Sequence, residues 1–320
     1  ADGGGSWLDC TRDLRRGDVN PTERIEMQRT LWNVYCGILH GLRGWAAGGT
    51  LSVTYRCDCP EFQTLLARYP VEKVAGKGSG FARALRLCRW LYPRLKHNGV
   101  YKNCVPCNSL ALLDFCFEKE DGINCVNKAK ILAECCLALG IPARRVYLYP
   151  LSPYDLDNHV VTEIYDSSLK NWIMLDPTEG TYFTGVEGKP LSVLEVRDAM
   201  ANNLHVTAVR PRQSIRDLDA LFEKNLSNGI NCYYAKNMAY FMVDCVNTFG
   251  TEGACALLAP AGLDVRARVL QHIRFVLRWA KREATHLVDG YEAWYKSVET
   301  QEDMPRISET AWAAMPNFGG

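Results

Sequence analysis

A cysteine, a histidine and an aspartate follow one another along this chain in an order that suits thiol catalysis. Cys125 stands at the start of a helical pattern, and His159 and Asp176 stand at the start and the end of two β-like runs. A thiol nucleophile needs a base that takes its proton and a carboxylate that orients the base. These three residue types supply the three functions, so the pattern predicts a cysteine enzyme.

The predicted helix begins at the nucleophile itself. Asn124 is a good N-cap, because its side-chain oxygen can accept from the free N–H groups of the first turn, and Cys125 is then the first helical residue. The thiol lies at the positive end of the helix dipole, where the thiolate is favoured. Apolar residues recur at spacings of three and four over residues 126–137, so we expect one buried face. Gly140 followed by Pro142 ends the helix.

Two β-like runs follow the helix and are joined by a turn-rich stretch, which predicts a hairpin. In the expected register, Asp166 pairs with Asn171. Val161 then lies opposite Asp176, and His159 is the diagonal neighbour of Asp176 on the same face. Diagonal Cβ atoms are roughly 7 Å apart, a gap that an imidazole and a carboxylate can bridge. We therefore expect a hydrogen bond between His159 and Asp176.

The tetrapeptide Gly-Ile-Asn-Cys occurs twice, at residues 122–125 and at residues 229–232. The second copy precedes another apolar run, residues 233–246, which we expect to be helical. No strand pair with a histidine and a carboxylate follows it, so we expect Cys232 to be a packing residue. The evidence for a catalytic role of Cys125 therefore comes from the hairpin that follows it and not from the tetrapeptide itself.

Several further motifs occur in order between Asn108 and Thr184. They are Gly122-x-x-Cys125, Ala129 and Leu132, Leu-Gly-Ile-Pro-Ala-Arg at residues 139–144, His-Val-Val-x-Glu-x-Tyr at residues 159–165, and Trp-x-x-x-Asp-Pro-Thr at residues 172–178. This arrangement resembles the core signature of the transglutaminase-like superfamily. The resemblance implies an α+β, papain-like core in which the nucleophile helix packs on an antiparallel sheet. It also implies Cys125 as nucleophile, His159 as base and Asp176 as orienting acid.

The resemblance leaves the reaction open, because the superfamily includes transamidases, proteases, amidases and peptide N-glycanases. All of them attack an amide carbonyl with a thiolate, and they differ in whether water or an amine resolves the acyl-enzyme. Val126 follows the cysteine here, whereas animal transglutaminases carry an aromatic residue, which argues against an amine tunnel of the animal type. Residues 191–197 and 233–237 also resemble segments of bacterial transglutaminase-like proteins of unsettled function.

The proposed attack requires an oxyanion hole, whose donors commonly contribute a factor of about a hundred or more. The backbone N–H of Cys125 is the first expected donor, because it is free at a helix N-terminus. Asn108 is the second expected donor, since it precedes an apolar helical run that can pack beside the Cys125 helix. An equally good interpretation of Asn108 is a simple N-cap.

Composition limits the partners. The chain has 320 residues, 48% hydrophobic content and a net charge of +1. This content can bury a sizeable core, and the charge gives no electrostatic reason to expect a nucleic acid or an anionic membrane as partner. No apolar run approaches the roughly 20 residues that span a bilayer. We expect a peptide or protein substrate, and the sequence does not indicate an oligomeric state.

Fourteen cysteines are spread through helical patterns. Their apolar surroundings suit buried thiols better than a disulfide framework, which indicates a reducing, cytoplasmic setting and no cofactor. The alternative is a structural zinc ion, because four thiolates are enough to bind one. The candidate ligands are Cys57, Cys59, Cys104 and Cys107. Peptide N-glycanases carry paired Cys-x-x-Cys units before the catalytic cysteine, although the first pair here has the shorter Cys-x-Cys spacing.

Patterning divides the chain into four parts. Residues 1–100 are expected to be mainly helical, residues 101–190 to form the catalytic core, residues 191–301 to be helical, and residues 302–320 to be an extended tail. The expected elements outside the core are helices at residues 21–42, 80–95, 191–200, 214–226, 233–246 and 265–298, and a strand at residues 51–56.

The leading hypothesis is cysteine-dependent acyl transfer on an amide or isopeptide bond of a peptide or protein, with hydrolysis favoured over transamidation. One alternative is a non-catalytic scaffold that keeps the fold and binds peptides. Another is an acetyltransferase of the arylamine type, which also uses Cys, His and Asp, but the sequence shows no recognisable coenzyme A feature.

Overall fold

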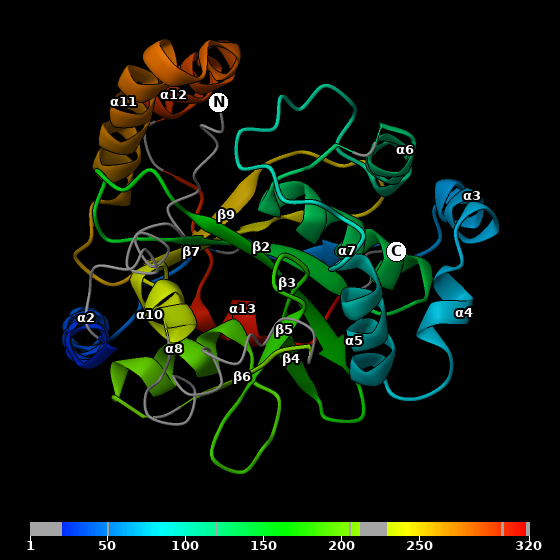
Figure 1. Ribbon diagram of the computed structural model, residues 1–320, viewed down its shortest axis with the longest axis horizontal. Coiled ribbons are helices and arrows are strands. Elements are labelled where there is room, and N and C mark those ends of the chain that lie inside the picture. Colours follow the sequence, from blue (N-terminus) through cyan, green and yellow to red (C-terminus); the bar gives the residue numbers. More distant parts are fainter. Residues whose placement is uncertain are drawn as a thin grey trace.

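The computed structural model describes residues 21–49, 51–119, 121–204, 206–211, 229–301 and 304–317, and only the backbone of residues 21–25, 229 and 230. Figure 1 shows a sheet with helices around it. The helices are α2 (Pro21–Gly41), α3 (Pro60–Arg68), α4 (Val71–Ala75), α5 (Gly80–Leu91), α6 (Ser109–Lys119), α7 (Cys125–Ala138), α8 (Val193–Ala201), α10 (Gly229–Lys236), α11 (Val265–Glu283), α12 (Val288–Thr300) and α13 (Glu309–Ala313). The strands are β1 (Thr54–Tyr55), β2 (Ala143–Tyr149), β3 (His159–Asp166), β4 (Asn171–Asp176), β5 (Thr181–Thr184), β6 (Thr207–Val209), β7 (Tyr240–Asp244), β8 (Val246–Asn247) and β9 (Cys255–Leu258).

A seven-stranded sheet with the order β6-β5-β4-β3-β2-β7-β9 forms the centre of the molecule. Every neighbouring pair in it is antiparallel. β3 is the middle strand, and all of its residues are buried. The α+β class and the antiparallel sheet expected from the sequence are therefore confirmed, and His159 begins the central strand.

Helix α7 packs against β2 and β3, and α3, α5 and α6 also contact it (Figure 1). Asn124 caps this helix as predicted, because its side-chain oxygen accepts from Asn127 N at 3.1 Å. Gly140 ends it in the left-handed conformation, with φ of 72°. The helix is buried nearly all round rather than on one face, since helices cover the side turned away from the sheet.

The buried charges on α7 are neutralised locally. Lys130 Nζ lies 3.1 Å from Glu134 Oε1 and donates to the backbone oxygen of Thr251 at 2.8 Å. The other carboxylate contacts of Glu134 come from Ser109 N at 2.7 Å and Gly250 N at 2.9 Å. A buried ion pair offsets its desolvation only when further hydrogen bonds satisfy both charges, as they do here. These bonds fix α6 and the segment near residue 250 against the nucleophile helix.

The β3–β4 hairpin has the predicted register. Asp166 pairs with Asn171, and continuing this register brings Val161 opposite Asp176. The Asp166 side chain also accepts from Phe81 N at 2.7 Å, which ties the start of α5 to the hairpin. The hairpin is thus fixed by its strand pairing and by this hydrogen bond to the start of α5.

The second half of residues 233–246 is a strand, so the helix expected there is wrong. Helix α10 ends at Lys236, and β7 pairs with both β2 and β9. Hydrogen bonds to two neighbouring strands decide the structure of a short apolar run that periodicity leaves ambiguous. The strand expected at residues 51–56 is only two residues long, β1, and runs parallel to β8. The helix expected at residues 214–226 lies outside the described residues.

The long helix expected at residues 265–298 is interrupted between α11 and α12 by a short 3₁₀ turn, Thr285–Leu287. Ala284 has φ of −151° and ψ of 58°, which no α-helix contains. The two helices run antiparallel and lie together at one corner of the molecule (Figure 1). Apolar side chains of α11, including Val265 and Val269, pack on Tyr149 and Leu257 of the sheet.

The tail was expected to be extended, but it contains α13 and belongs to the core. Trp312 is only 1% exposed. Its backbone oxygen accepts from Arg144 Nη2 at 3.0 Å, and Trp172 Nε1 donates to Ala314 O at 3.0 Å. The larger hydrophobic core holds side chains from Trp32 to Trp312, so the divisions expected at residues 100, 190 and 301 do not interrupt it.

None of the helices within the described ranges combines the length and the apolar character needed to cross a bilayer.

A buried ion pair links β2, β3 and α8. Arg144 Nη2 lies 2.7 Å from Glu163 Oε2, with side chains that are 1% and 0% exposed. The other carboxylate oxygen of Glu163 accepts from Val193 N at 2.8 Å. The substitution Glu163→Gln leaves a buried guanidinium without its counter-charge, so we expect the free energy of unfolding to fall by about 3–5 kcal/mol. Urea unfolding followed by circular dichroism measures this loss.

The matched control is an exposed ion pair on the α11–α12 hairpin. Lys281 Nζ lies 3.0 Å from Glu292 Oε1, with side chains that are 59% and 53% exposed. Because solvent screens this pair, Glu292→Gln is expected to change stability by less than about 1 kcal/mol. Equal losses in the two variants would contradict the assignment of Glu163 as a buried structural anion.

Candidate active site

Cys125, His159 and Asp176 meet at the N-terminus of α7. Cys125 is half-buried at the first helical position, and the His159 and Asp176 residues are 4% and 0% exposed. His159 Nε2 lies 2.6 Å from Asp176 Oδ2. The Cys125 thiol also interacts with the His159 ring and contributes to raising its pKa. Since Nε2 is engaged with the carboxylate, Nδ1 is the nitrogen left for the thiol, which is the geometry that a thiol and its base require.

The electrostatics favour a protonated imidazole. Burial of the His159 ring by itself would lower its pKa, but the charge and hydrogen bond of Asp176 and the contact with Cys125 raise the pKa well above its usual value. A protonated His159 beside Cys125 stabilises a thiolate by direct charge attraction. The site therefore places a protonated imidazole beside the Cys125 sulfur.

The Asp176 carboxylate is completely enclosed and fully hydrogen-bonded. Burial raises its pKa, but His159, the hydroxyl of Tyr234 and the backbone N–H of Thr178 lower it, and the net pKa lies below the usual value. Thr178 N donates to Oδ1 at 2.7 Å, and the Tyr234 hydroxyl donates to Oδ2, the same oxygen that receives His159. The thiol of Cys88 lies 3.4 Å from the backbone oxygen of Asp176. The carboxylate thus stays ionised and fixed in orientation.

Sequence reasoning missed two tyrosines at this site. Tyr233 and Tyr234, on α10, both pack edge-on against the His159 ring, with centroids 5.4 and 5.6 Å away. Cys232 in the same helix is buried, and its sulfur lies 3.5 Å from the backbone oxygen of Gln28. The expectation that Cys232 packs is met, but the segment that follows it contacts the site. The similarity of residues 233–237 to bacterial relatives was the available signal.

The two expected oxyanion donors lie at the starts of different helices. The N–H of Cys125 is the first of α7, so helix geometry gives it no intrahelical acceptor. Asn108 instead caps α6, with its side-chain oxygen accepting from Ala111 N at 2.9 Å. The adjacent Ser109 binds Glu134, nine residues beyond Cys125 and so about 13 Å further along the helix axis. The N-cap interpretation of Asn108 therefore agrees with its contacts, and no contact joins its side chain to Cys125 among the described residues.

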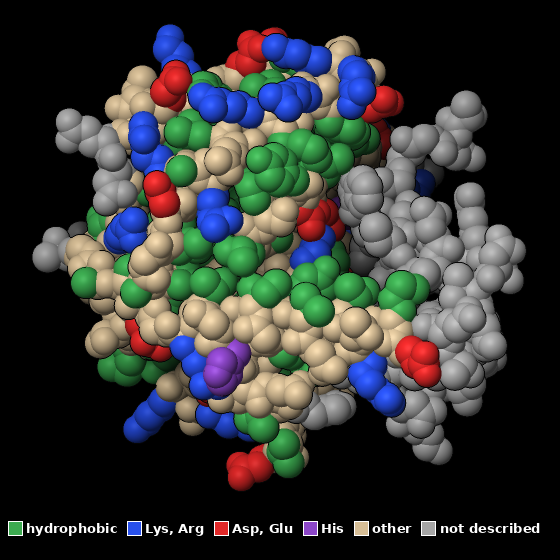
Figure 2. All heavy atoms as spheres, turned by 90° about the vertical axis from the view of Figure 1, so that its left-hand side faces the viewer, with side chains coloured by type: hydrophobic (Ala, Val, Ile, Leu, Met, Phe, Trp, Pro, Cys, Tyr) green, Lys and Arg blue, Asp and Glu red, His purple; other side chains and the backbone are tan. Residues whose placement is uncertain are grey.

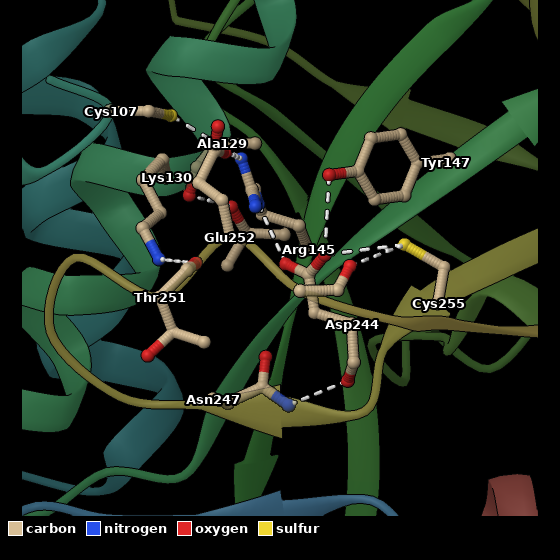
Figure 3. A network of polar contacts seen from close by, with 12 residues as sticks. Cys107, Ala129, Lys130, Arg145, Tyr147, Asp244, Asn247, Thr251, Glu252 and Cys255 are labelled. Atoms are coloured by element: carbon tan, nitrogen blue, oxygen red, sulfur yellow. Dashed lines mark hydrogen bonds and ion pairs between the residues drawn. The ribbon is translucent and has the colours of Figure 1, made fainter. Parts of the chain in front are cut away.

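The four cysteines considered for zinc do not form one cluster. Among the described residues, no three His, Cys, Asp or Glu side chains lie close enough together to hold a metal ion. Cys59 Sγ lies 2.7 Å from the Thr248 hydroxyl, and Cys104 Sγ lies 3.7 Å from the Tyr101 hydroxyl. Cys107 points toward Arg145, at 3.5 Å, within a network of polar contacts (Figure 3). Cys57 is half-buried and carries a free thiol.

Tyrosine side chains from three separate elements are within electrostatic range of the Cys125 thiol. Tyr149 at the end of β2, Tyr233 on α10 and Tyr291 on α12 all lie close enough to interact with its charge. Burial raises the pKa of each of these phenols, so they are neutral near pH 7. Lys128, one turn after Cys125, is 1% exposed, and burial lowers its pKa although Asp176 and Glu179 oppose this shift. Neutral phenols and one buried lysine are therefore among the groups that interact with Cys125.

Figure 2 shows the face of the molecule that carries α2, α10, α11 and α12. Hydrophobic side chains are spread over the middle of this face, and Lys and Arg side chains gather along its top. The exposed basic residues of α11 are Arg274, Arg278, Lys281 and Arg282.

The substitution Asp176→Asn tests the electrostatic link within the site. Removing the carboxylate leaves burial as the main influence on His159, so we expect its pKa to fall from above the usual value of about 6.5 to below it. NMR of the imidazole Cε1–H signal, with a His159→Gln variant to assign it among the six histidines, follows the titration. An unchanged titration in Asp176→Asn would show that the carboxylate does not control the base.

Comparison with known proteins agrees with the residues that form this site. Residues 68–177 match the family model of the transglutaminase-like superfamily, and this range contains Cys125, His159 and Asp176. A search of curated proteins found no match. Among solved structures, a candidate cysteine protease from Cytophaga hutchinsonii is 21% identical, with a TM-score of 0.29. The alignment covers 49% of this chain and 51% of that chain, so the chain spans about half the length of that protein. Over residues 68–177 the chain thus matches the model of the transglutaminase-like superfamily that its motifs predicted.

Proposed function

We propose that this protein catalyses cysteine-dependent acyl transfer on an amide or isopeptide bond of a peptide or protein. The superfamily match supports a papain-like cysteine enzyme in general. One observation supports the finer proposal: His159 Nε2 lies 2.6 Å from Oδ2 of the buried Asp176, and the same ring interacts with the Cys125 thiol.

The reaction begins with attack of the Cys125 thiolate on the amide carbonyl carbon. The carbonyl oxygen takes up the negative charge, and the N–H of Cys125 at the start of α7 donates to it. His159 then transfers its proton to the departing amine as the C–N bond breaks, which leaves a thioester on Cys125 and a neutral imidazole. Asp176 keeps the ring in the orientation needed for both transfers.

The second half of the reaction regenerates the thiol. Neutral His159 takes a proton from water as the oxygen attacks the thioester carbonyl, and the thiolate leaves with the imidazolium restored. An amine in place of water would give transamidation by the same steps. Val126 is a half-buried aliphatic residue where animal transglutaminases carry an aromatic one, which supports hydrolysis over transamidation.

The substrate approaches, in this proposal, from the face shown in Figure 2. Tyr233 and Tyr291 lie near the thiol on that side and offer apolar ring surface to the acyl group. Every cysteine within the described ranges carries a free thiol, which supports the reducing, cytoplasmic setting proposed from the sequence. The proposed chemistry uses neither a metal ion nor a cofactor.

Trapping the acyl-enzyme tests this function. A library of peptides with activated amide or ester bonds is incubated with the protein at neutral pH, and the Cys125-containing tryptic peptide is examined by mass spectrometry. This peptide, residues 120–128, contains no other cysteine. We expect an acyl adduct on it in the wild type. Because a general base contributes about 10²–10⁴-fold, His159→Ala is expected to slow adduct formation by at least about a hundredfold.

The control is Cys125→Ala, which retains the fold and lacks the sulfur. Adducts that persist at the same rate in this variant, on other residues, would overturn the acyl-enzyme mechanism. Binding of peptides without any adduct on Cys125 would favour the non-catalytic scaffold. An adduct formed only with acetyl-coenzyme A would favour the acetyltransferase alternative, and resolution by added amine rather than water would favour transamidation.

A further inference from the structure

Several hydrogen-bond donors fix the orientation of the Asp176 carboxylate. One of them lies outside residues 68–177, the range that matches the superfamily model. Asp176 Oδ2 accepts from both His159 Nε2 and the Tyr234 hydroxyl. Oδ1 accepts from Thr178 N, two residues further along the chain. Local backbone therefore fixes one carboxylate oxygen, and Tyr234, 58 residues away in sequence, helps to fix the other.

Tyr234 is held rigidly in this position. Its side chain is 0% exposed, and its ring packs edge-on against Phe183 with centroids 4.8 Å apart. Within α10, the buried Asn231 donates from its side chain to Val206 O at 2.9 Å, and α10 also packs on α2. Burial and the neighbouring Asp176 charge raise the pKa of Tyr234 well above its usual value, so its hydroxyl retains the proton that it donates.

The same helix also holds the loop before His159. Lys236 Nζ lies 2.9 Å from Asp155 Oδ2, and the Tyr233 hydroxyl lies 3.4 Å from Asp157 Oδ1. Asp157 is two residues before His159. Helix α10 thus contacts the catalytic base at its ring, at its loop and through its carboxylate partner.

We propose that Tyr234 is a positioning residue, whose hydroxyl holds Asp176 Oδ2 where it receives His159 and so sets the imidazole against Cys125. This inference rests on the proposed function. The tyrosine does not touch the substrate and transfers no proton; it restricts rotation of the carboxylate and supplies one of the donors that keep it ionised. Hydrogen bonds to a buried charge are among the stronger ones, so losing this one has a measurable effect.

The substitution Tyr234→Phe removes the hydroxyl and keeps the ring. Asp176 then loses one donor, which raises its pKa, while its other neighbours remain as they are. The ionisable groups that face it from the surrounding elements are His159, Cys88, Tyr92, Lys128, Glu179 and Tyr233. A carboxylate that protonates at higher pH stops orienting His159 at higher pH. As the pH is lowered, the reactivity of Cys125 should therefore decline at a higher pH than in the wild type.

The experiment follows alkylation of Cys125 by iodoacetamide from pH 4.5 to pH 9, read on the tryptic peptide of residues 120–128. For Tyr234→Phe we expect a rate about tenfold lower at pH 6 and an acid limb displaced to higher pH. A merely structural role would lower the melting temperature and leave the position of the limb unchanged. A profile identical to that of the wild type would overturn the inference.

Tyr147→Phe is the matched control. The Tyr147 hydroxyl also donates to a carboxylate, Asp244 Oδ1 at 3.2 Å, but within the separate network of Figure 3. In that network Arg145 Nε lies 2.7 Å from Asp244 Oδ2. This variant loses the same kind of bond and is expected to keep the wild-type pH profile for Cys125.

A double-variant cycle identifies the route of the effect. If Tyr234 acts through Asp176, then Tyr234→Phe should change the alkylation rate by less than twofold in an Asp176→Asn background. Additive losses would show that the hydroxyl acts by another path and would overturn the inference. The proposed function is tested separately. It is wrong if His159→Ala leaves the alkylation rate of Cys125 unchanged, whatever the result for Tyr234→Phe.

Discussion

The stabilisation of one buried carboxylate is the constraint on which this structure depends most. Asp176 is completely enclosed, and an ionised carboxyl group without partners would cost several kcal/mol there. Its charge is kept by His159 on one side and by hydrogen bonds from Tyr234 and Thr178 on the others. The same arrangement raises the pKa of His159, so a requirement of burial and the orientation of the proposed base are met by one set of contacts.

Strands and a buried helix of the surrounding fold hold the groups around this carboxylate in fixed positions. His159 begins the central strand of the sheet, and Asp176 ends the strand beside it, so the two side chains are fixed by backbone pairing. Cys125 begins a helix that is buried along most of its length, and the pair of Lys130 and Glu134 compensates the charges that this burial would otherwise isolate. The three groups consequently meet with little freedom, which is what a reaction that depends on short proton transfers requires.

Local sequence predicted the parts of the site that depend on local physics. Asn124 as a cap, Gly140 as a helix end and the register set by Asp166 and Asn171 all follow from short-range rules, and the structure confirms each of them. Contacts between distant segments could not be predicted in this way. Tyr234 reaches Asp176 across 58 residues, and Arg144 reaches the backbone of Trp312 across 168.

The errors have the same origin. β7 shows apolar spacing compatible with a helix, but pairing with β2 and β9 makes it a strand, and the tail folds into α13 because Trp312 fills the core. Spacing along the chain indicates which residues can face one another, whereas packing decides which of them do.

The central claim is that His159, held by Asp176, maintains a reactive thiolate at Cys125. The most direct test is the rate at which Cys125 is alkylated at pH 6 in the wild type and in His159→Ala. An ordinary thiol is under about 1% ionised at that pH. We expect rapid alkylation of wild-type Cys125 and a loss of about a hundredfold or more in His159→Ala. Equal rates, both following the pH dependence of an ordinary thiol, would contradict it.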